Sequence, residues 1–448
     1  MKQRGIDLLN GDIFRSLSLL AIPIMATFMI QMAYNLIDMI WIGYVGANAV
    51  ASIGAAGMYM WLSNGLVTMP KIGGQIYLAQ SLGQRDEQSG KAYVRGSLQM
   101  TLVFGLIFGL VVMLFTKPLI AFFNLSDPQV VLDAQNYLFI TSGLIVFSFV
   151  NQTFTGLFTA MGNSKTTFIA TVSGLVLNII LDPLLIFGFG FVPAFGVLGA
   201  AIATVIAQAV VSLVFIYVAM REPLFMNLRL LGKVDFSLQR KLVKIGFPTA
   251  VQSMLFTGIS MLIARMIAGF GDQAVAVQKV GSQIESISWM IADGFSASLN
   301  AFIAQNYGAG NISRVREGYK VGMKVVGIWG IFCTALLMLC AGDIFQIFIH
   351  EAEILPLGVD YLWILGISQL FMCVEIATQG AFSGLGKTLP PSIVSIVFTV
   401  ARIPMAVFLS RQLGLNGIWW AITISSILKG CILFIWYIFH VRKQFATS

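Results

Sequence analysis

Long apolar runs alternate with short polar stretches along almost the whole chain. Twelve of these runs are long enough to cross a bilayer, because a spanning helix needs about 20 residues. The expected spans are residues 17–43, 50–80, 92–116, 133–158, 167–190, 197–220, 243–268, 275–305, 319–347, 357–383, 391–411 and 417–440. The pattern therefore predicts an all-α integral membrane protein with twelve transmembrane helices.

The composition agrees with a membrane protein. Of the 448 residues, 58% are hydrophobic and only 10% are charged, whereas soluble domains carry roughly 25% charged residues. The net charge of +8 does not indicate a nucleic-acid partner, because no basic cluster is interleaved with aromatic residues. The four cysteines lie inside apolar runs, which is typical of small buried side chains rather than of a metal site.

The basic residues indicate the orientation in the membrane. If the twelve spans alternate in direction, 21 of the 27 Lys and Arg residues fall on one side. They are Lys2, Arg4, Arg15, Arg85, Lys91, Arg95, Lys165, Arg221, Arg229, Lys233, Arg240, Lys241, Lys244, Arg314, Arg316, Lys320, Lys324, Lys387, Lys429, Arg442 and Lys443. Cytoplasmic loops are rich in basic residues. We therefore expect both termini in the cytoplasm and the protein in the plasma membrane of a prokaryote.

The chain contains an internal repeat. A polar stretch divides it into an expected N-lobe (1–220), a cytoplasmic linker (221–242) and a C-lobe (243–448). A shift of 225 residues places Gly46 on Gly271, and a shift of 224 places Gly156 on Gly380. Each half has six spans, so both halves have the same orientation and are related by an axis along the membrane normal. The prediction is two pseudo-symmetric six-helix bundles with a substrate cleft between them.

Two acidic residues lie deep inside apolar spans. Asp182 follows Asn178 by four residues, so the two side chains share one helix face. Pro183 should kink this helix and free the carbonyl of Ile179. Asp38 and Asp182 both lie within roughly 7–12 Å of the outer ends of their spans, at 1.5 Å of helix rise per residue. Carboxylates inside a membrane usually mark an ion, proton or substrate path.

Polar residues also follow one face of span 275–305. They recur at steps of three or four residues, at Gln278, Ser282, Glu285, Trp289, Asp293, Ser296 and Asn300. The repeat-related span 50–80 has its own set, at Asn64, Thr68, Lys71 and Gln75. A polar face in a membrane helix must meet protein or water. We interpret both faces as cleft walls; the alternative is packing against a neighbouring helix of the same lobe.

Several segments together resemble the multidrug and toxic compound extrusion (MATE) family, most closely its DinF-like branch. They are AIPIM at 21–25, YNLIDMIWIGYVG at 34–46, AQSLG at 79–83, LNIILDP at 177–183, GVLGAAIAT at 196–204 and AQNYG at 304–308. The resemblance covers nearly the whole chain. It implies the V-shaped MATE fold of two six-helix lobes. It also implies a secondary active antiporter that exports drug-like, often cationic molecules against an inward flow of H⁺ or Na⁺.

The resemblance also assigns the coupling residues. Asp38 and Asp182 match the family's acidic pair, and Tyr34, Asn178 and Thr204 match its hydrogen-bonding partners. Two close carboxyls in a dry pocket cannot both ionise cheaply, so one of them should bind a proton. The same pocket can instead hold Na⁺ at Asp182, Asn178 and Thr204. The alternative for Asp38 is a structural cap or pair near the membrane interface.

The second half departs from the best-known sodium-coupled branch, because Phe256 stands where that branch has a glutamate. Glu375 is a further candidate for cation binding. Arg402 occupies the repeat position of Asn178, and it either neutralises Glu375 or acts directly. Met29 and Trp41 belong to a group of methionine and aromatic side chains in the first span. Such surfaces suit flat cations, although ordinary packing accounts for them equally well.

These observations favour secondary active multidrug efflux, and hence drug resistance, by alternating access. We expect no enzyme activity and no cofactor apart from the coupling ion, H⁺ rather than Na⁺. The expected partners are small organic cations and the lipid bilayer, with no nucleic acid, and the protein should be a monomer. The alternative is an exporter of a lipid-linked or polysaccharide intermediate, for which Lys71 alone is weak support. ATP-driven transport is not expected, because the chain lacks the G-x-x-x-x-G-K-[ST] motif.

Overall fold

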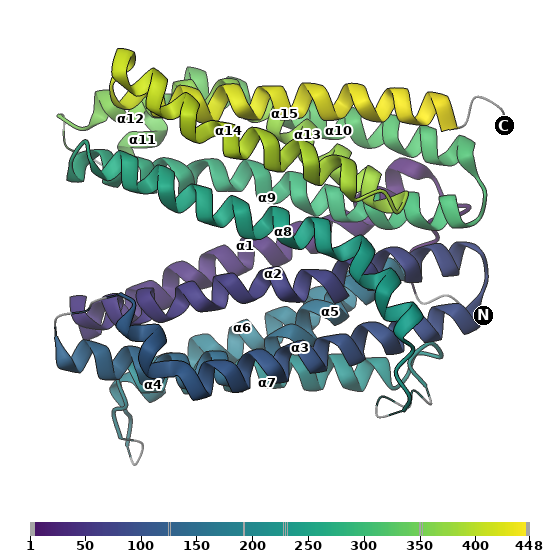
Figure 1. The fold of residues 1–448 in the computed structure, drawn as a ribbon, viewed down its shortest axis with the longest axis horizontal. Coiled ribbons are helices and arrows are strands. Elements are labelled where there is room, and N and C mark those ends of the chain that lie inside the picture. Colours follow the sequence, from purple (N-terminus) through teal and green to yellow (C-terminus); the bar gives the residue numbers. More distant parts are fainter. Residues whose placement is uncertain are drawn as a thin grey trace. The chain divides into compact units, whose positions relative to one another are not determined.

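The computed structural model describes residues 5–123, 125, 127–190, 193–226, 228, 230, 232–348, 351 and 353–444, and the regular elements there are α helices (Figure 1). The first half contains α1 (Ile13–Val45), α2 (Ala47–Gly83), α3 (Glu87–Ala121), α4 (Pro128–Gly143), α5 (Val146–Ala160), α6 (Ser164–Phe187) and α7 (Val197–Ala219). The second half contains α8 (Phe236–Ala268), α9 (Asp272–Gly308), α10 (Ile312–Leu339), α11 (Ala341–Gln346), α12 (Leu355–Ile367), α13 (Gln369–Gly384), α14 (Leu389–Leu413) and α15 (Leu415–Gln444).

The helices confirm the all-α membrane fold and show that two of the expected spans are bent. Eight described helices are long and apolar enough to cross a membrane, and two bent helix pairs also pass this test. The remaining long helices, α2 and α9, have 37 residues each and carry the two polar faces. The expected spans 133–158 and 357–383 each correspond to two helices joined at a bend. The first is α4 and α5, bent by 43°, and the second is α12 and α13, bent by 44°.

The second of these bends has a local cause in the sequence. It falls at Ser368, between α12 and α13. The Ser368 hydroxyl donates to the carbonyl of Leu365 at 2.9 Å, and serine side chains that bond to nearby backbone in this way often bend helices. A single serine inside an apolar run leaves little trace in the hydrophobic pattern, so the span looks continuous in the sequence.

The chain forms two compact units. Unit 1 contains the chain up to Ile6 together with Ala26–Ala250, and unit 2 contains Asp7–Met25 and Val251–Ser448. The chain therefore passes between units three times: after Ile6, inside α1 and inside α8. Each passage inside a helix lies close to a proline, Pro23 in α1 and Pro248 in α8, which a shift of 225 residues places on each other. Proline removes a backbone hydrogen bond, so both helices are weakened near these passages.

The internal repeat is visible in the packing of each unit. In unit 1, α2 and α5 approach so closely that a methyl group on Gly156 would lie 2.9 Å from the carbonyl oxygen of Lys71. In unit 2, α9 and α13 meet in the same way, and a methyl group on Gly380 would lie 2.4 Å from the carbonyl oxygen of Ser296. These four residues are repeat partners, so each unit uses glycine for the same close helix contact.

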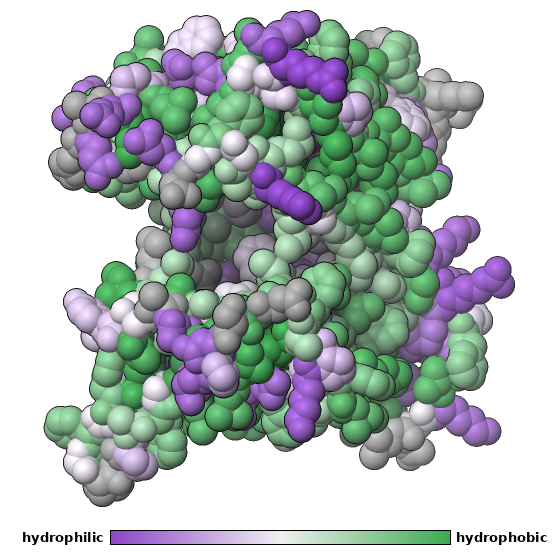
Figure 2. Space-filling view, turned by 60° about the vertical axis from the view of Figure 1, so that its left-hand side comes forward, coloured by the Kyte–Doolittle hydropathy of each residue, from purple (hydrophilic) through white to green (hydrophobic). Residues whose placement is uncertain are grey.

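The surface of each unit suits lipid. On α3, Leu106, Leu110 and Leu114 recur every four residues and are 62%, 59% and 69% exposed. Figure 2 shows large hydrophobic areas on one face of the protein, with hydrophilic residues in smaller groups. Exposed apolar surface of this extent is unusual for soluble proteins and normal for a protein surrounded by hydrocarbon.

One member of the predicted cytoplasmic basic set is misplaced. Lys429 lies midway along α15 and is 5% exposed, and its Nζ is 3.1 Å from Oε2 of Glu375. The assignment of Lys429 to the cytoplasmic side is therefore wrong, and 20 of the 27 basic residues remain in that set. A lysine in the middle of an apolar run is costly to bury, and here a buried acid supplies its partner.

Candidate functional site

The candidate site lies inside unit 1, where α1 and α6 each contribute two polar side chains. Tyr34 and Asp38 are four residues apart on α1, and Asn178 and Asp182 are four residues apart on α6. This spacing places each pair on one helix face. The helix α6 continues through Pro183 to Phe187, and proline offers no N–H to the carbonyl four residues earlier. The sequence-predicted polar residues of the two helices therefore meet within one unit.

A chain of hydrogen bonds joins these side chains. The Tyr34 hydroxyl donates to Oδ1 of Asn178 at 2.6 Å. Nδ2 of Asn178 donates to Oδ1 of Asp182, also at 2.6 Å. The carboxyl of Asp38 lies within hydrogen-bonding reach of the Asp182 carboxyl. The structure thus brings Asp38 and Asp182 together.

The second oxygen of Asp182 is the important atom in this arrangement. Asp182 is 0% exposed and Asn178 is 4% exposed. Among the described residues, Oδ2 of Asp182 is buried and receives no hydrogen bond from a donor. A buried acceptor without a donor costs about 1–3 kcal/mol. A proton shared between the two carboxyls supplies the missing donor, and so does a bound cation.

Two further hydroxyl groups complete the site. Thr204 of α7 lies within hydrogen-bonding reach of the hydroxyls of both Tyr34 and Tyr137. Tyr137 belongs to α4, is 6% exposed, and lies close enough to Asp38 and Asp182 to interact electrostatically with both. The sequence analysis did not identify Tyr137. A signal was present, because a shift of 224 residues places it on Tyr361.

Close packing of α6 against α7 holds Thr204 beside the acids. A methyl group on Gly199 of α7 would lie 2.3 Å from the carbonyl oxygen of Leu185 in α6. The turn between the helices closes with backbone bonds from Phe195 to Leu185 and from Gly196 to Ile186. Since only glycine permits this approach, the GVLGAAIAT segment positions α7 as well as supplying Thr204.

The carboxyl and hydroxyl groups of the site offer oxygen atoms as ligands, and oxygen ligands suit a proton or a hard cation. The described residues contain no group of three or more His, Cys, Asp or Glu side chains that could hold a metal ion. Asn178 presents its NH₂ group to Asp182, and its oxygen already accepts from Tyr34. In this orientation Asn178 offers no amide oxygen to a cation bound at Asp182.

The polar face of α9 is divided between two environments. Gln278 and Glu285 turn toward the interior of unit 2, where Tyr361 of α12 contacts both. Trp289 is 39% exposed, and Asp293 is exposed. The role of these residues as cleft walls stays a prediction.

The charged residues of unit 2 pair differently from the expected scheme. Glu375 of α13 is paired with Lys429. Nε and Nη2 of Arg402 donate to the hydroxyls of Ser425 and Ser426 at 2.6 and 3.0 Å. Lys429, rather than Arg402, is therefore the ion-pair partner of Glu375.

The remaining candidates of unit 1 are spread over several surroundings. Met29 is 47% exposed. Trp41 packs edge-on against Phe187, with ring centroids 6.1 Å apart. Oδ1 of Asn64 accepts from Nε2 of Gln152 at 2.9 Å, and Lys71 is half-buried. The geometry does not gather these side chains around the carboxyls.

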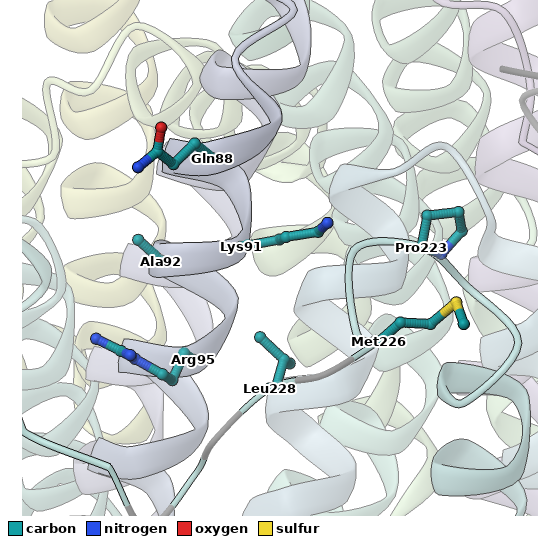
Figure 3. Close-up of a pocket in the computed structure, with 7 residues that line it drawn as sticks. All are labelled: Gln88, Lys91, Ala92, Arg95, Pro223, Met226 and Leu228. Atoms are coloured by element: carbon teal, nitrogen blue, oxygen red, sulfur yellow. The ribbon is translucent and has the colours of Figure 1, made fainter.

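Unit 1 also contains a cavity of about 590 Å³ that is separate from this site. Its lining comes from the start of α3 and from the chain after α7, at Gln88, Lys91, Ala92, Arg95, Pro223, Met226 and Leu228 (Figure 3). Lys91 points toward Pro223 and Met226 in Figure 3, and it pairs with Glu87 at 2.9 Å. No carboxyl of the candidate site lines this cavity.

Comparison with known proteins identifies the family. The MatE family model matches residues 23–184 and 248–408, which is more than half of the chain. The chain is 26% identical over 432 residues to "Probable multidrug resistance protein NorM" of Thermotoga maritima, covering 95% of this chain and 92% of the relative. It is also 26% identical over 446 residues to "Probable multidrug resistance protein YoeA" of Bacillus subtilis, covering 97% of this chain and 96% of the relative.

Solved structures share the fold. One is described as the "Outward-facing conformation of a multidrug resistance MATE family transporter of the MOP superfamily", with a TM-score of 0.92, 23% identity and full coverage of both chains. Another, the "Crystal structure of MATE in complex with MaL6", has a TM-score of 0.91 and 22% identity and covers 99% of this chain and 100% of that chain. The family model together with this fold shows that the chain belongs to the MatE family of secondary transporters, which are not enzymes.

Proposed function

We propose that this transporter exports drug-like organic cations and takes up protons in exchange. The Asp38–Asp182 pair carries this proposal, because two adjoining carboxyls with an unsatisfied buried oxygen form a proton-binding site. The names of the relatives as multidrug resistance proteins support a drug-like cargo. The exchange needs no cofactor.

The pair couples the two fluxes through charge. When the site opens to the outside, a proton enters and is shared between Asp38 and Asp182. The lower negative charge weakens the hold on a cationic cargo, which leaves. The transporter then opens to the cytoplasm, where the proton is released and the restored negative charge favours a new cation. Tyr34, Asn178 and Thr204 keep the carboxyls in place during both steps.

The orientation of Asn178 favours a proton over Na⁺ as the coupling ion. Na⁺ binds through oxygen ligands, and Asn178 turns its NH₂ group toward Asp182. Reversing this amide would place its oxygen against a carboxylate oxygen and remove the acceptor of the Tyr34 hydroxyl. A proton between the carboxyls requires no such change.

The cargo site is proposed from side chains with suitable chemistry. Met29 and Trp41 of unit 1 and Trp289 of unit 2 offer thioether and aromatic surfaces for flat cations. Asn64, Lys71, Gln278 and Asp293 are further cleft candidates, whereas the ion pair with Lys429 accounts for Glu375. We propose that the protein works as a monomer in the bilayer.

Purified protein in liposomes tests the exchange directly. Under an imposed pH gradient, uphill movement of a fluorescent organic cation should exceed that in protein-free liposomes. A sodium gradient of equal size at uniform pH should give little movement. If sodium drives transport and the pH gradient does not, the proton assignment is wrong; if neither gradient moves the cation, the proposed function fails.

The orientation can be tested with two matched cysteines. We propose that both termini and the end of α2 are cytoplasmic and that the end of α14 faces outward. In a background without the four native cysteines, the Gln412→Cys variant should react with an impermeant maleimide in intact cells. The Gln84→Cys variant should react only after permeabilisation. Both glutamines are exposed, so access to the reagent decides the result. Labelling of the Gln84→Cys variant in intact cells would reverse the proposed orientation.

A further inference from the structure

A second carboxyl with unusual partners is partly buried within unit 2. Glu285 of α9 accepts a hydrogen bond at Oε1 from the hydroxyl of Tyr361. Its Oε2 accepts from Nε2 of Gln369 at 3.1 Å. Both donors are neutral. An ionised carboxylate here is held by hydrogen bonds alone, without a cation in contact.

The fully buried acid of unit 2, Glu375, differs in this respect. Glu375 is neutralised at contact distance by Lys429, whereas Glu285 is in no ion pair that the described residues form. Arg402 of α14 interacts electrostatically with Glu285, but its guanidinium is bound to Ser425 and Ser426. Of these two acids of unit 2, Glu285 is therefore the one without a counter-charge at contact distance.

Gln369 supplies an observation that points to a proton. It is 0% exposed, its Nε2 bonds to Glu285 and to the carbonyl of Leu365, and its Oε1 receives no hydrogen bond from a described donor. A side-chain amide has a donor end and an acceptor end. If Glu285 takes up a proton on Oε2, rotation of the amide lets Oε1 accept that proton in a hydrogen bond. Gln369 can thus hydrogen-bond to Glu285 both when this carboxyl is ionised and when it is protonated.

Neighbouring side chains hold Tyr361 in position beside Glu285. Nε1 of Trp419 donates to Oε1 of Gln278 at 3.0 Å, and Nε2 of Gln278 faces the Tyr361 hydroxyl at 3.5 Å. The rings of Tyr361 and Trp419 pack edge to face, with centroids 5.1 Å apart. Within the described part of the chain, Tyr361 from α12 and Arg402 from α14 are the titratable or charged groups that interact with Glu285, and α13 contributes the neutral Gln369.

We propose that Glu285 is a second proton-binding carboxyl of the transport cycle, positioned by Tyr361 and Gln369. This inference rests on the proposed proton exchange and adds a site in the other unit. One proton from water forms an O–H bond on Oε2, the charge of the site rises by one, and the same bond breaks when the proton is released. The Asp38–Asp182 pair and Glu285 then carry separate protons.

Infrared difference spectroscopy of the full protein in lipid tests this site. The intensity of the protonated-carboxyl band is measured while the pH is changed. Wild type should show a titrating band, and the Asp38→Asn/Asp182→Asn variant should keep part of it. Adding Glu285→Gln to that variant should remove the remaining part. The matched control is Glu375→Gln/Lys429→Met, which removes the ion-paired acid of unit 2 together with its partner and should leave the band unchanged.

The outcomes separate this proposal from the proposed function. If the Asp38→Asn/Asp182→Asn variant keeps no titrating band, or if Glu285→Gln leaves the remaining band intact, Glu285 is not a proton site. If Asp38→Asn/Asp182→Asn removes no intensity from the band, the proposal that this pair in unit 1 binds a proton is wrong instead. Should the Glu285→Gln variant not fold, Glu285→Asp keeps the carboxyl on a shorter side chain and must change the frequency or midpoint of the same band.

Discussion

Replacing Asp182 with asparagine should reduce gradient-driven efflux to the level of protein-free liposomes while the protein remains inserted and folded. Asparagine has the shape of aspartate, and its amide oxygen can still accept from Nδ2 of Asn178. It cannot bind and release a proton near neutral pH, so the coupling step is lost. Asp38→Asn should have the same effect, because the two carboxyls act as one unit.

The measurement is uphill transport of a fluorescent organic cation under a fixed pH gradient. The matched control is Asp86→Asn, the same substitution at the exposed start of α3. The Asp86 side chain accepts from the backbone N–H of Ser89, and asparagine caps helices as well as aspartate does. This variant should transport at the wild-type rate. Normal pumping by the Asp182→Asn variant under a proton or sodium gradient would show that Asp182 is not a coupling residue.

Breaking the buried ion pair of unit 2 should cost the most stability. Glu375 and Lys429 are 6% and 5% exposed, and their charged atoms are 3.1 Å apart. Glu375→Gln leaves the ammonium of Lys429 buried without its counter-charge. Removing one partner of such a pair costs about 3–5 kcal/mol. We expect a clear fall in the apparent unfolding midpoint of the purified protein.

Two comparisons isolate the cause of that loss. The Glu375→Gln/Lys429→Met variant removes both charges, so its stability should return most of the way to wild type. The pair formed by Glu87 and Lys91 has a similar distance of 2.9 Å, but its side chains are 44% and 39% exposed. Glu87→Gln should therefore change stability by about 1 kcal/mol or less. If Glu375→Gln and Glu87→Gln lower the unfolding midpoint equally, the claim that burial makes the Glu375–Lys429 pair costly to break is wrong.

Periodicity and the internal repeat predicted most of the fold, because a membrane helix must be apolar over its full length. The spacing of Asn178 and Asp182 and the depth of Asp38 likewise pointed to one site. Tyr137 was missed because a tyrosine inside an apolar span carries no charge that marks its depth. The partner of Glu375 was missed because pairing across helices depends on how α13 and α15 pack, which the pattern of one helix does not contain.

Comparison of repeat partners shows where the two units differ in their polar residues. The repeat partners of Asp38 and Asp182 are Ile263 and Ala406, so unit 2 has no equivalent acidic pair. Tyr361 is retained there as the counterpart of Tyr137. The Tyr361 hydroxyl donates to Glu285, an acid that belongs to α9. The acids of unit 1 belong instead to α1 and α6, whose counterparts in unit 2 are α8 and α14. Unit 2 has kept part of the site while changing the helix that supplies the acid.

The central claim is that the Asp38–Asp182 pair exchanges a proton for the cargo cation. This claim is tested by measuring proton release when cargo binds, with a pH indicator in weakly buffered solution. The protein carries Glu285→Gln, so that Glu285 does not contribute to the protons released. Adding a fluorescent organic cation should release protons in proportion to the cation bound. With Asp38→Asn and Asp182→Asn added, the cation should still bind, seen by its fluorescence, but release no protons. Undiminished release from that triple variant would contradict the account.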